Sequence, residues 1–441
     1  MRPNRTDNSR ESAASPGKDL QRTIVPRPPL RLSVFLLGVI ILSTQFLSPL
    51  PDYFGIVSSR AVGMIGAACI AILIMGFFTG QSPRPRNLTL LDSSAKGLVV
   101  CACLISGIVL HGIIVSWILP LDLNRFAASL IPFLFLSFGA IAIATAIKSS
   151  TAQQIDTVMW ASFSAFTAII VLRLLGVQPR SSVFTHPVFP FSETSHFTLA
   201  FGPVYLYRCV RARNSSQYFW IIFGVLIAVL LHSATLLAFV GGSALLCRKS
   251  LFLVALAGVA FIAGAATHLS YFTSRANISS HSSSISALVY LQGWEFIIRS
   301  LHETHALGLG FQQLGVHSLS APASDLIRAM NNGKNLNTMD GSFLFSKLAS
   351  EFGVIGLALG VAYLFMCFRL IRRLRSHVVH AHDIFPACVF VGFGVDMFIR
   401  GIGYFYGGPI LFVGALLSLP RSKSIFRVTS GGAFGRQVVL R

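Results

Sequence analysis

The sequence predicts an all-α fold: a polytopic integral membrane protein of about 12 transmembrane helices with one long loop on the outer side. Of its 441 residues, 54% are hydrophobic and 11% are charged, whereas ordinary soluble domains carry about 25% charged residues. Apolar runs of roughly 20 residues, the length that crosses a bilayer as a helix, recur along most of the chain. These runs do not alternate with period two, so the pattern excludes an outer-membrane barrel.

The predicted spans follow one another in chain order. The first nine lie near 32–50, 61–79, 97–119, 127–147, 157–176, 197–209, 218–231, 233–246 and 251–267. After a long gap, three more lie near 342–367, 384–401 and 403–420. Two of these segments, 197–209 and 233–246, are short, so the predicted number of spans has a margin of about one or two.

The distribution of Lys and Arg predicts the orientation. With the N-terminus in the cytoplasm, 25 of the 35 Lys and Arg residues fall in segments on the inner side, and 10 fall outside or within spans. Cytoplasmic loops carry such an excess, so we expect both termini to be cytoplasmic. The formal net charge of +20 follows from the same rule, and we expect no nucleic acid as a partner.

The chain divides into five regions. Residues 1–31 are polar and basic and lack the apolar stretch of a signal peptide, so we expect a disordered cytoplasmic tail. Residues 32–267 hold the first nine spans, 268–341 the large outer loop, 342–420 the last three spans, and 421–441 a second cytoplasmic tail. The seven cysteines fall in spans or on the inner side and form no CxxC pattern, so neither a disulfide framework nor a metal site is expected.

The large outer loop contains one segment with helical periodicity, 286–306. Its apolar and aromatic residues at helical spacing are Leu288, Tyr290, Leu291, Trp294, Ile297 and Leu301. This pattern is typical of a helix that rests at the membrane interface, where aromatic side chains are enriched.

The segment RSLHETHALGLG, residues 299–310, gathers charge and glycine within this loop. Arg299 carries a planar guanidinium that pairs with two phosphate oxygens at once, so it fits either a lipid-linked substrate or simple anchoring to lipid headgroups. His305 is a candidate acid or base, although a polar loop residue is the simpler interpretation. Gly308 and Gly310 let the backbone turn and approach a ligand closely, and a plain helix end would also explain Gly308.

Acidic residues follow where the outer loop enters the next span. Asp340 lies at the loop exit with no cation at helical spacing, which favours it as a proton acceptor. Glu351 lies deeper, four residues after Lys347, and this spacing predicts an ion pair within the helix. The sequence repeats the same spacing at Asp396 and Arg400, which predicts a second pair of this kind.

Further arginines on the outer side are candidates for binding an anionic group. Arg173 and Arg180 flank the second outer loop, 177–196, which also carries Glu193 and His196. Arg275 lies at the start of the large loop. Arginines near the ends of spans are also common anchors, so both interpretations stay open.

The chain resembles a known family in the order of several motifs. A hydroxyl-rich short helix (HSATLLAFVGG) precedes a long outer loop that contains GWEFIIRSLHETHALGLGFQQLG, and a span opening SFLFSKLASEFGVIGLALG follows. Ten residues separate Arg299 from Gly310. These features resemble the Wzy-type polysaccharide polymerases of the O-antigen ligase and polymerase superfamily. Ser342 stands where the ligases have a histidine, and the second outer loop lacks the arginine-to-glycine spacing, since Phe191 occupies that position after Arg180.

The resemblance implies a metal-independent glycosyltransferase without cofactors at the periplasmic face of a bacterial inner membrane. A glycan on undecaprenyl pyrophosphate would be transferred to a sugar hydroxyl of a second lipid-linked repeat unit. The residues that would bind substrate are Arg173, Arg180, Arg275, Arg299 and Gly310, and those that would act in catalysis are Asp340 and His305. Besides its lipid-linked glycan and membrane lipid, such a protein would work with a chain-length regulator and a flippase.

Two alternatives stay open beside the polymerase. A ligase that transfers glycan to lipid A core would use the same chemistry. A polysaccharide transporter or flippase would belong to a different class, typically with two related halves and matching broken helices. The sequence shows no such pairing and one unusually long outer loop.

Overall fold

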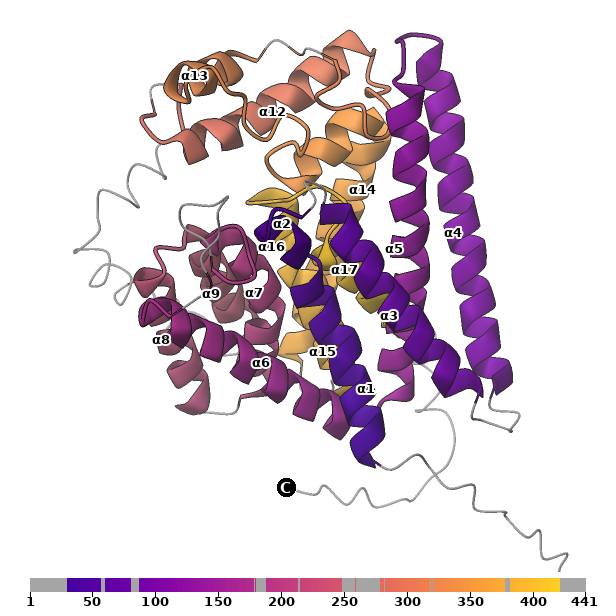
Figure 1. The fold of residues 1–441 in the computed structure, drawn as a ribbon, viewed down its shortest axis with the longest axis vertical. Helices are drawn as coiled ribbons and strands as arrows, with labels where there is room; N and C mark the ends of the chain where they lie inside the picture. The colour runs from indigo at the N-terminus through magenta and orange to yellow at the C-terminus, as the bar shows by residue number, and fades with distance from the viewer. Residues whose placement is uncertain are drawn as a thin grey trace, which may run out of the picture.

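The computed structural model describes residues 30–56, 60–80, 87–177, 179, 188–212, 215–247, 258, 278–280, 282–317, 319, 321–376 and 381–420. Within these residues all regular structure is helical, and the only β-type pairing consists of isolated bridges. Figure 1 shows a bundle of steep helices with two shorter ones lying across one end. The prediction of an all-α fold is confirmed.

The helices run as follows in chain order. The first half contains α1 (Leu30–Leu42), the π-helical turn η1 (Ser43–Leu47), α2 (Leu50–Tyr53), α3 (Arg60–Gly80), α4 (Asn87–Ser116), α5 (Leu123–Ser149), α6 (Ala152–Leu174), α7 (Thr194–Arg211), α8 (Ser215–Leu230) and α9 (Ala234–Leu246). The second half contains α12 (Ile285–Glu303), α13 (Pro322–Met330), α14 (Leu344–Arg375), α15 (Ala381–Gly392), α16 (Gly394–Phe398) and α17 (Gly407–Ser418).

Helices occupy all or most of every predicted apolar segment within the described residues, while 251–267 lies outside them. Five helical stretches are long and apolar enough to cross a membrane: Leu32–Tyr53, Gly97–Ser116, Leu123–Ser149, Ala152–Leu174 and Leu344–Arg375. Other apolar helices, such as Ala234–Leu246, are shorter. The larger number of spans stays a prediction.

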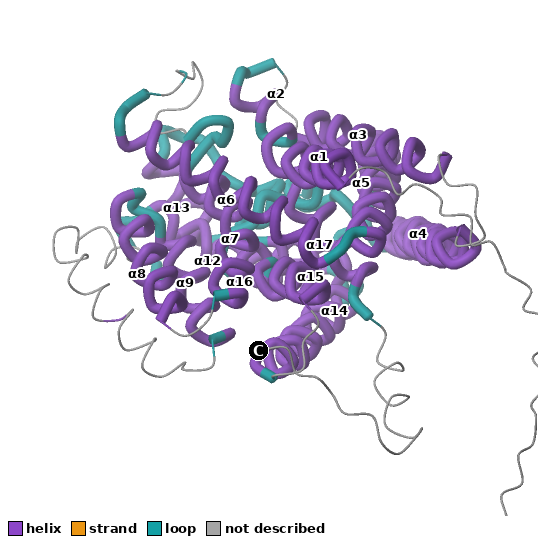
Figure 2. The backbone as a smooth tube through the Cα atoms, turned by 90° about the horizontal axis from the view of Figure 1, so that it is seen from below, coloured by secondary structure: helices purple, strands orange, loops and turns teal. Residues whose placement is uncertain are grey.

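Two of the long helices expose apolar side chains on the outside of the bundle. Figure 2 shows α4 and α14 at its edges. Val99 on α4 is 62% exposed, and Val361 and Phe365 on α14 are 68% and 61% exposed. Soluble monomers rarely expose large contiguous apolar patches. These surfaces therefore indicate a membrane environment.

Small residues let the central helices α3, α5 and α17 pack closely. A Cβ added to Gly139 on α5 would lie 2.5 Å from Cδ1 of Ile410 and 2.9 Å from Cβ of Ala68. A Cβ added to Gly414 on α17 would lie 2.7 Å from Cγ2 of Ile143. Small residues at helix contacts allow such close approach in membrane proteins. This contact forms the centre of the bundle.

The predicted helix of the large loop is present as α12, which lies with α13 across one end of the bundle (Figure 1). Part of its apolar face packs against other segments of the protein. Leu288 packs with Ile327 of α13, and Ile297 packs with Phe343 at the start of α14. The protein itself therefore covers part of this face, while Trp294 on the helix is 37% exposed, and the position of the helix at the membrane interface stays a prediction.

The loop after α12 is joined to a break in α14. Gly353 lies inside α14 with φ 57° and ψ −132°, so the helical hydrogen bonds cannot continue through it. The N–H groups of Leu309 and Gly310 donate to the carbonyls of Ser350 and Glu351, both at 2.9 Å, and the N–H of Val354 donates to Ala306 at 2.9 Å. We call this contact the splice.

Glycine is required on both sides of the splice because backbone meets backbone. A Cβ added to Gly308 would lie 2.4 Å from the nitrogen of Gly353, and one added to Gly353 would lie 2.0 Å from the carbonyl oxygen of Ala306. Gly308, Gly310 and Gly353 also have positive φ, which other residues adopt at a cost. The Gly-Leu-Gly of the sequence is thus explained by close packing within the protein.

The splice predicts a large effect of a single methyl group. We expect Gly353→Ala to lower the stability of the protein by about 2 kcal/mol or more, since strain at a positive φ adds to the clash with Ala306. Thermal unfolding in detergent would measure it. Gly241→Ala on α9 is the control, because nothing lies within 4 Å of the added Cβ. Equal melting temperatures for the two variants would contradict the role of the splice.

The orientation predicted from charge can be tested independently. A cysteine at Ser283, before α12, should react in intact cells with a thiol reagent that does not cross membranes. One at Ser376, directly after the last arginine of α14, should not react. The reverse labelling pattern would show that the orientation is inverted.

Candidate functional site

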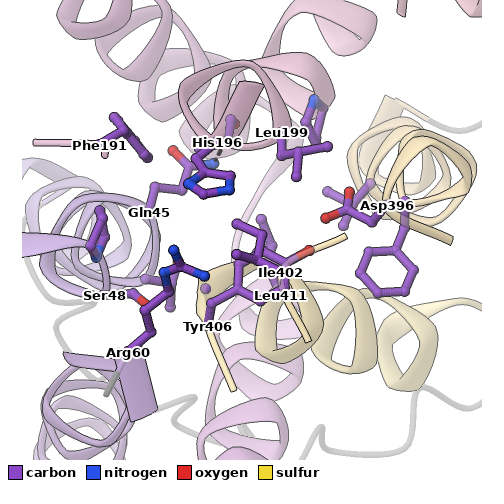
Figure 3. Close-up of a pocket in the computed structure, with 18 of the residues that line it drawn as sticks. Gln45, Ser48, Arg60, Phe191, His196, Leu199, Asp396, Ile402, Tyr406 and Leu411 are labelled. Atoms are coloured by element: carbon purple, nitrogen blue, oxygen red, sulfur yellow. Dashed lines mark hydrogen bonds between the residues drawn. The ribbon is translucent and has the colours of Figure 1, made fainter. Parts of the chain in front are cut away.

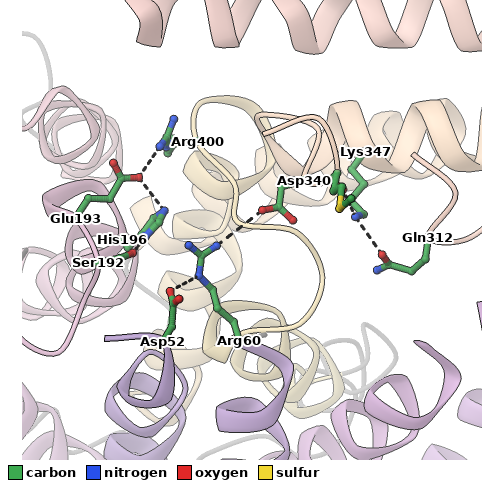
Figure 4. A network of polar contacts seen from close by, with 10 residues as sticks. Asp52, Arg60, Ser192, Glu193, His196, Gln312, Asp340, Lys347 and Arg400 are labelled. Carbon is green, nitrogen blue, oxygen red and sulfur yellow. Dashed lines mark hydrogen bonds and ion pairs between the residues drawn. The ribbon is translucent and has the colours of Figure 1, made fainter. Parts of the chain in front are cut away.

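Charged and polar groups from four distant segments meet near the α12–α13 end of the bundle (Figure 4). The members are Asp52 in α2 and Arg60 at the start of α3, Ser192, Glu193 and His196 at the start of α7, Asp340 before α14, and Arg400 after α16. We call this group the junction. Most of its members lie just outside helix ends, where backbone turns bring side chains together.

Arg60, the first residue of α3, connects two acids. Its Nε lies 3.1 Å from Oδ2 of Asp52, and its Nη1 lies 3.9 Å from Oδ2 of Asp340. Asp340 has no cation at helical spacing in the sequence, but the fold brings Arg60 beside it. Helical spacing could reveal only neighbours on the same helix, whereas this arginine comes from the other half of the chain.

A chain of polar contacts runs from Ser192 to Arg400. The Oγ of Ser192 lies 2.7 Å from Nδ1 of His196, and Nε2 of His196 lies 2.9 Å from Oε1 of Glu193. Arg400 donates from Nη2 to the same carboxylate oxygen. With a neutral imidazole, Nε2–H donates to Glu193 and Nδ1 accepts from the Ser192 hydroxyl.

The surroundings favour this protonation state. Burial lowers the pKa of His196, with Arg60 and Arg400 acting in the same direction and Glu193 against them. For Glu193, burial alone would raise the pKa, but His196 and Arg400 outweigh it and hold the pKa of the carboxyl well below its usual range. At neutral pH the carboxylate is therefore ionised and the imidazole is uncharged.

Two cavities adjoin this chain of contacts. The tight cavity has a volume of ≈ 50 Å³, and Figure 3 shows Arg60, His196, Asp396 and Tyr406 on its wall. The wide cavity has a volume of ≈ 310 Å³, with Glu193 and Arg400 on its wall. One water needs roughly 10–15 Å³ of such space. The tight cavity therefore fits only a few waters, whereas the wide cavity fits a small polar group.

The pair expected between Asp396 and Arg400 is wrong. Arg400 pairs with Glu193 instead, and Asp396 is buried with no hydrogen-bond partner for its Oδ1. The physical reason is the end of α16 at Phe398, because residues four apart face each other only while the helix continues. Arg400 lies beyond that end and reaches the start of α7.

The ion pair between Lys347 and Glu351 is confirmed. Their charged atoms lie 3.7 Å apart, and the side chains are 2% and 0% exposed. The Nζ of Lys347 also donates to Oε1 of Gln312 at 3.3 Å and to the carbonyl of Met339. Lys347 thus connects the loop after the splice and the segment before α14 to the first turns of α14.

The remaining predicted site residues have different surroundings. Arg299 is exposed on α12, and His305 is exposed in the turn that follows; among the described residues no hydrogen bond or ion pair joins either one to the junction. Gly310 is buried, and its N–H serves the splice. Arg173 is half-buried at the end of α6, while Arg180 and Arg275 lie outside the described residues.

Sequence reasoning underrated Arg60 and Arg400. The sequence did not single out Arg60 among its arginines, it paired Arg400 with Asp396, and it marked Glu193 and His196 only as members of an outer loop. One feature of the sequence could have indicated these pairs. A charged side chain next to apolar helices is energetically costly, so it usually has a partner of opposite charge. This cost indicates that Arg60 needs an acid but not which one.

Comparisons with known proteins give no further guide: the chain matches no family model, no curated protein and no solved structure. Among the described residues, no group of three or more His, Cys, Asp or Glu side chains is arranged to hold a metal ion.

The contact between Glu193 and Arg400 predicts a pH-dependent contribution to stability. A carboxyl whose pKa is lowered by folding stabilises the protein above its unfolded pKa, about 4.3, and this contribution is lost as the pH falls towards the folded pKa. Glu193→Gln should therefore lower the melting temperature by a constant amount from neutral pH down to about pH 5. Below that, the difference from the wild type should shrink.

The control for this measurement is Asp325→Asn. Asp325 pairs with Arg328 at 3.7 Å on the exposed face of α13, and exposed pairs contribute little. A difference for Glu193→Gln that grows as the pH falls would contradict the assigned contact.

Proposed function

We propose that the protein is a polymerase that joins undecaprenyl-pyrophosphate-linked oligosaccharide repeat units into a surface polysaccharide at the periplasmic face of a bacterial inner membrane. The observation that supports this most is the junction itself. Arg60 lies beside the acid Asp340, and Arg400 pairs with Glu193 in the same group of contacts, at one end of helices that are apolar enough to cross a membrane. A substrate with a lipid tail and an anionic linkage requires this combination of surfaces.

The reaction has a simple balance. The hydroxyl oxygen of the acceptor sugar bonds to the anomeric carbon of the donor glycan, and the bond from that carbon to the pyrophosphate oxygen breaks. Undecaprenyl pyrophosphate leaves with the bonding electrons, and the hydroxyl proton passes to a base. The proposed reaction needs neither a metal ion nor a cofactor.

Arginine near the departing group supports the first part of this chemistry. Negative charge grows on the pyrophosphate as the bond breaks, and fixed cations stabilise it in the transition state. The guanidinium of Arg400 donates to Glu193 from Nη2 only, and its Nε has no hydrogen-bond partner in the described structure. The group therefore keeps donors for a second anion. Arg299, exposed on α12, is available to a lipid headgroup at the rim.

Asp340 is the acid that we propose to accept the proton. Its side chain is 38% exposed, so solvent and an acceptor hydroxyl can reach it although Arg60 stands on one side. A Cβ on Gly403 would lie 2.8 Å from its Oδ1, so the segment between α16 and α17 also contacts it. His305, the second candidate, is exposed in a turn, and within the described part of the chain no hydrogen bond or ion pair links it to Asp340.

A transporter or flippase is the second candidate function, because several helices of the bundle are interrupted. The π-helical turn η1, the break of α14 at Gly353 and the gap between α15 and α16 are features that transporters also use near substrate sites. A ligase acting on lipid A core would share the site chemistry of the polymerase.

The proposed function predicts that Asp340→Asn abolishes polymer at normal protein abundance. Losing a general base slows a reaction by roughly 10²–10⁴-fold, so chains should shorten towards single repeat units. Polymer length on gels and protein abundance by immunoblot would be measured in cells that depend on this gene. Asp325→Asn, an exposed acid on α13, is the matched control.

The outcomes separate the candidate functions. Lipid-linked single repeats on the periplasmic side indicate a polymerase, whereas repeats retained on the cytoplasmic side indicate a flippase. Polymer that is made but not attached to lipid A core indicates a ligase. Polymer of normal length from Asp340→Asn would rule out Asp340 as the base.

A further inference from the structure

The wide cavity has an unusual wall for a protein with so few charges. Its polar lining consists of Glu193, Ser195, Thr235, Ser286, Tyr290, Ser342 and Arg400. Five of these seven are hydroxyl side chains, which donate and accept hydrogen bonds without adding charge. The positions of these hydroxyls in the helices indicate what kind of ligand the cavity binds.

Three helices begin at this wall. α7 begins at Thr194, α9 at Ala234 and α12 at Ile285, and the second residue of each, Ser195, Thr235 and Ser286, lines the cavity. The first N–H groups of a helix have no backbone partner within it, although at α9 the Ser233 hydroxyl already accepts from the N–H of Leu236. Each helix start also carries the equivalent of roughly half a positive charge. Three starts at one cavity therefore form an environment suited to an anion.

A second and independent observation points to a ligand. Ser342 is only 3% exposed and lines the cavity, yet its Oγ has no hydrogen-bond partner in the described structure. The Nε of Arg400 also lacks a partner. Buried polar groups are normally hydrogen-bonded, so these two groups are donors suited to an acceptor in the cavity.

Glu193 also stands on the wall and opposes an anion. Its carboxylate accepts from His196 and Arg400, so the negative charge of Glu193 and the positive charge of Arg400 nearly cancel. The three helix starts then decide the sign of the electrostatic potential in the cavity, since together they contribute the equivalent of roughly +1.5 charges. The cavity therefore favours an anion as long as Arg400 holds Glu193.

We propose that the wide cavity binds a phosphate or diphosphate group. This inference deepens the proposed function, on which its biological meaning rests, because it identifies where the pyrophosphate of a lipid-linked donor is held. The same chemistry would recognise free diphosphate. The site adds hydroxyl and backbone donors to the arginines, so it binds the group from several directions.

The test is a direct binding measurement that requires no glycosyl transfer. Full-length protein in lipid nanodiscs is titrated with inorganic pyrophosphate, with undecaprenyl pyrophosphate and with a neutral methyl glycoside, and binding is followed by calorimetry. We expect both diphosphates to bind, more weakly as salt is raised. Equal affinities locate recognition in the diphosphate alone, whereas tighter binding of the lipid form adds a contribution from the prenyl chain.

Variants assign the binding to this cavity. Thr235→Val and Ser342→Ala each remove one hydroxyl, and we expect roughly fivefold to tenfold weaker binding. Arg400→Gln should weaken binding more, because it also frees the charge of Glu193. Ser243→Ala on α9 is the matched control, since its hydroxyl donates to Val240 within its own helix at 2.7 Å.

Two results would overturn the inference: binding of the glycoside but not of either diphosphate, or diphosphate binding that Thr235→Val and Ser342→Ala leave equal to the control. The proposed function fails separately. If Asp340→Asn and the wild type bind diphosphate equally but the wild type makes no polymer, the cavity assignment stands and the polymerase does not.

Discussion

The splice between the loop after α12 and the break in α14 is the contact on which the arrangement of the site depends. In apolar surroundings every backbone N–H and C=O must find a partner, so a helix cannot simply stop. The backbone from Ala306 to Gly310 supplies these partners at Gly353. The splice thereby fixes the loop that follows, and the Lys347 contacts to Gln312 and Met339 hold that loop against α14. Asp340 and Ser342 lie next to these contacts and take their positions from them.

Charge near the apolar helices is held in pairs, and the ends of helices decide which pairs form. Lys347 and Glu351 lie on one continuous stretch of α14 and meet each other, as their spacing indicates. Arg400 lies beyond the end of α16, so it turns away from Asp396 and meets Glu193 at the start of α7. Removing one partner of such a pair leaves an uncompensated charge, which costs more than the pair contributes.

The difference between contacts within one helix and contacts between distant segments explains what the sequence could and could not predict. Apolar periodicity located the helices, including α12, because burial in lipid or protein requires the same side chains. It did not predict that α12 packs on α13 and Phe343, since lipid and protein are equally apolar partners. Contacts within a helix, such as Lys347 with Glu351, follow from spacing. Arg60 with Asp340 and Glu193 with Arg400 join segments that only the folded chain brings together.

A chain with 11% charged residues can still build a polar site by ending helices there. Each helix start offers unpaired N–H groups and a partial positive charge without an ionisable side chain. That charge cannot be lost by a change of protonation, and its desolvation is shared along the helix backbone. The starts of α7, α9 and α12 meet at the wide cavity, while full charges remain few and paired around it. The splice applies the same principle to a helix interior, because the loop after α12 pairs the backbone groups that the break of α14 at Gly353 would otherwise leave unpaired.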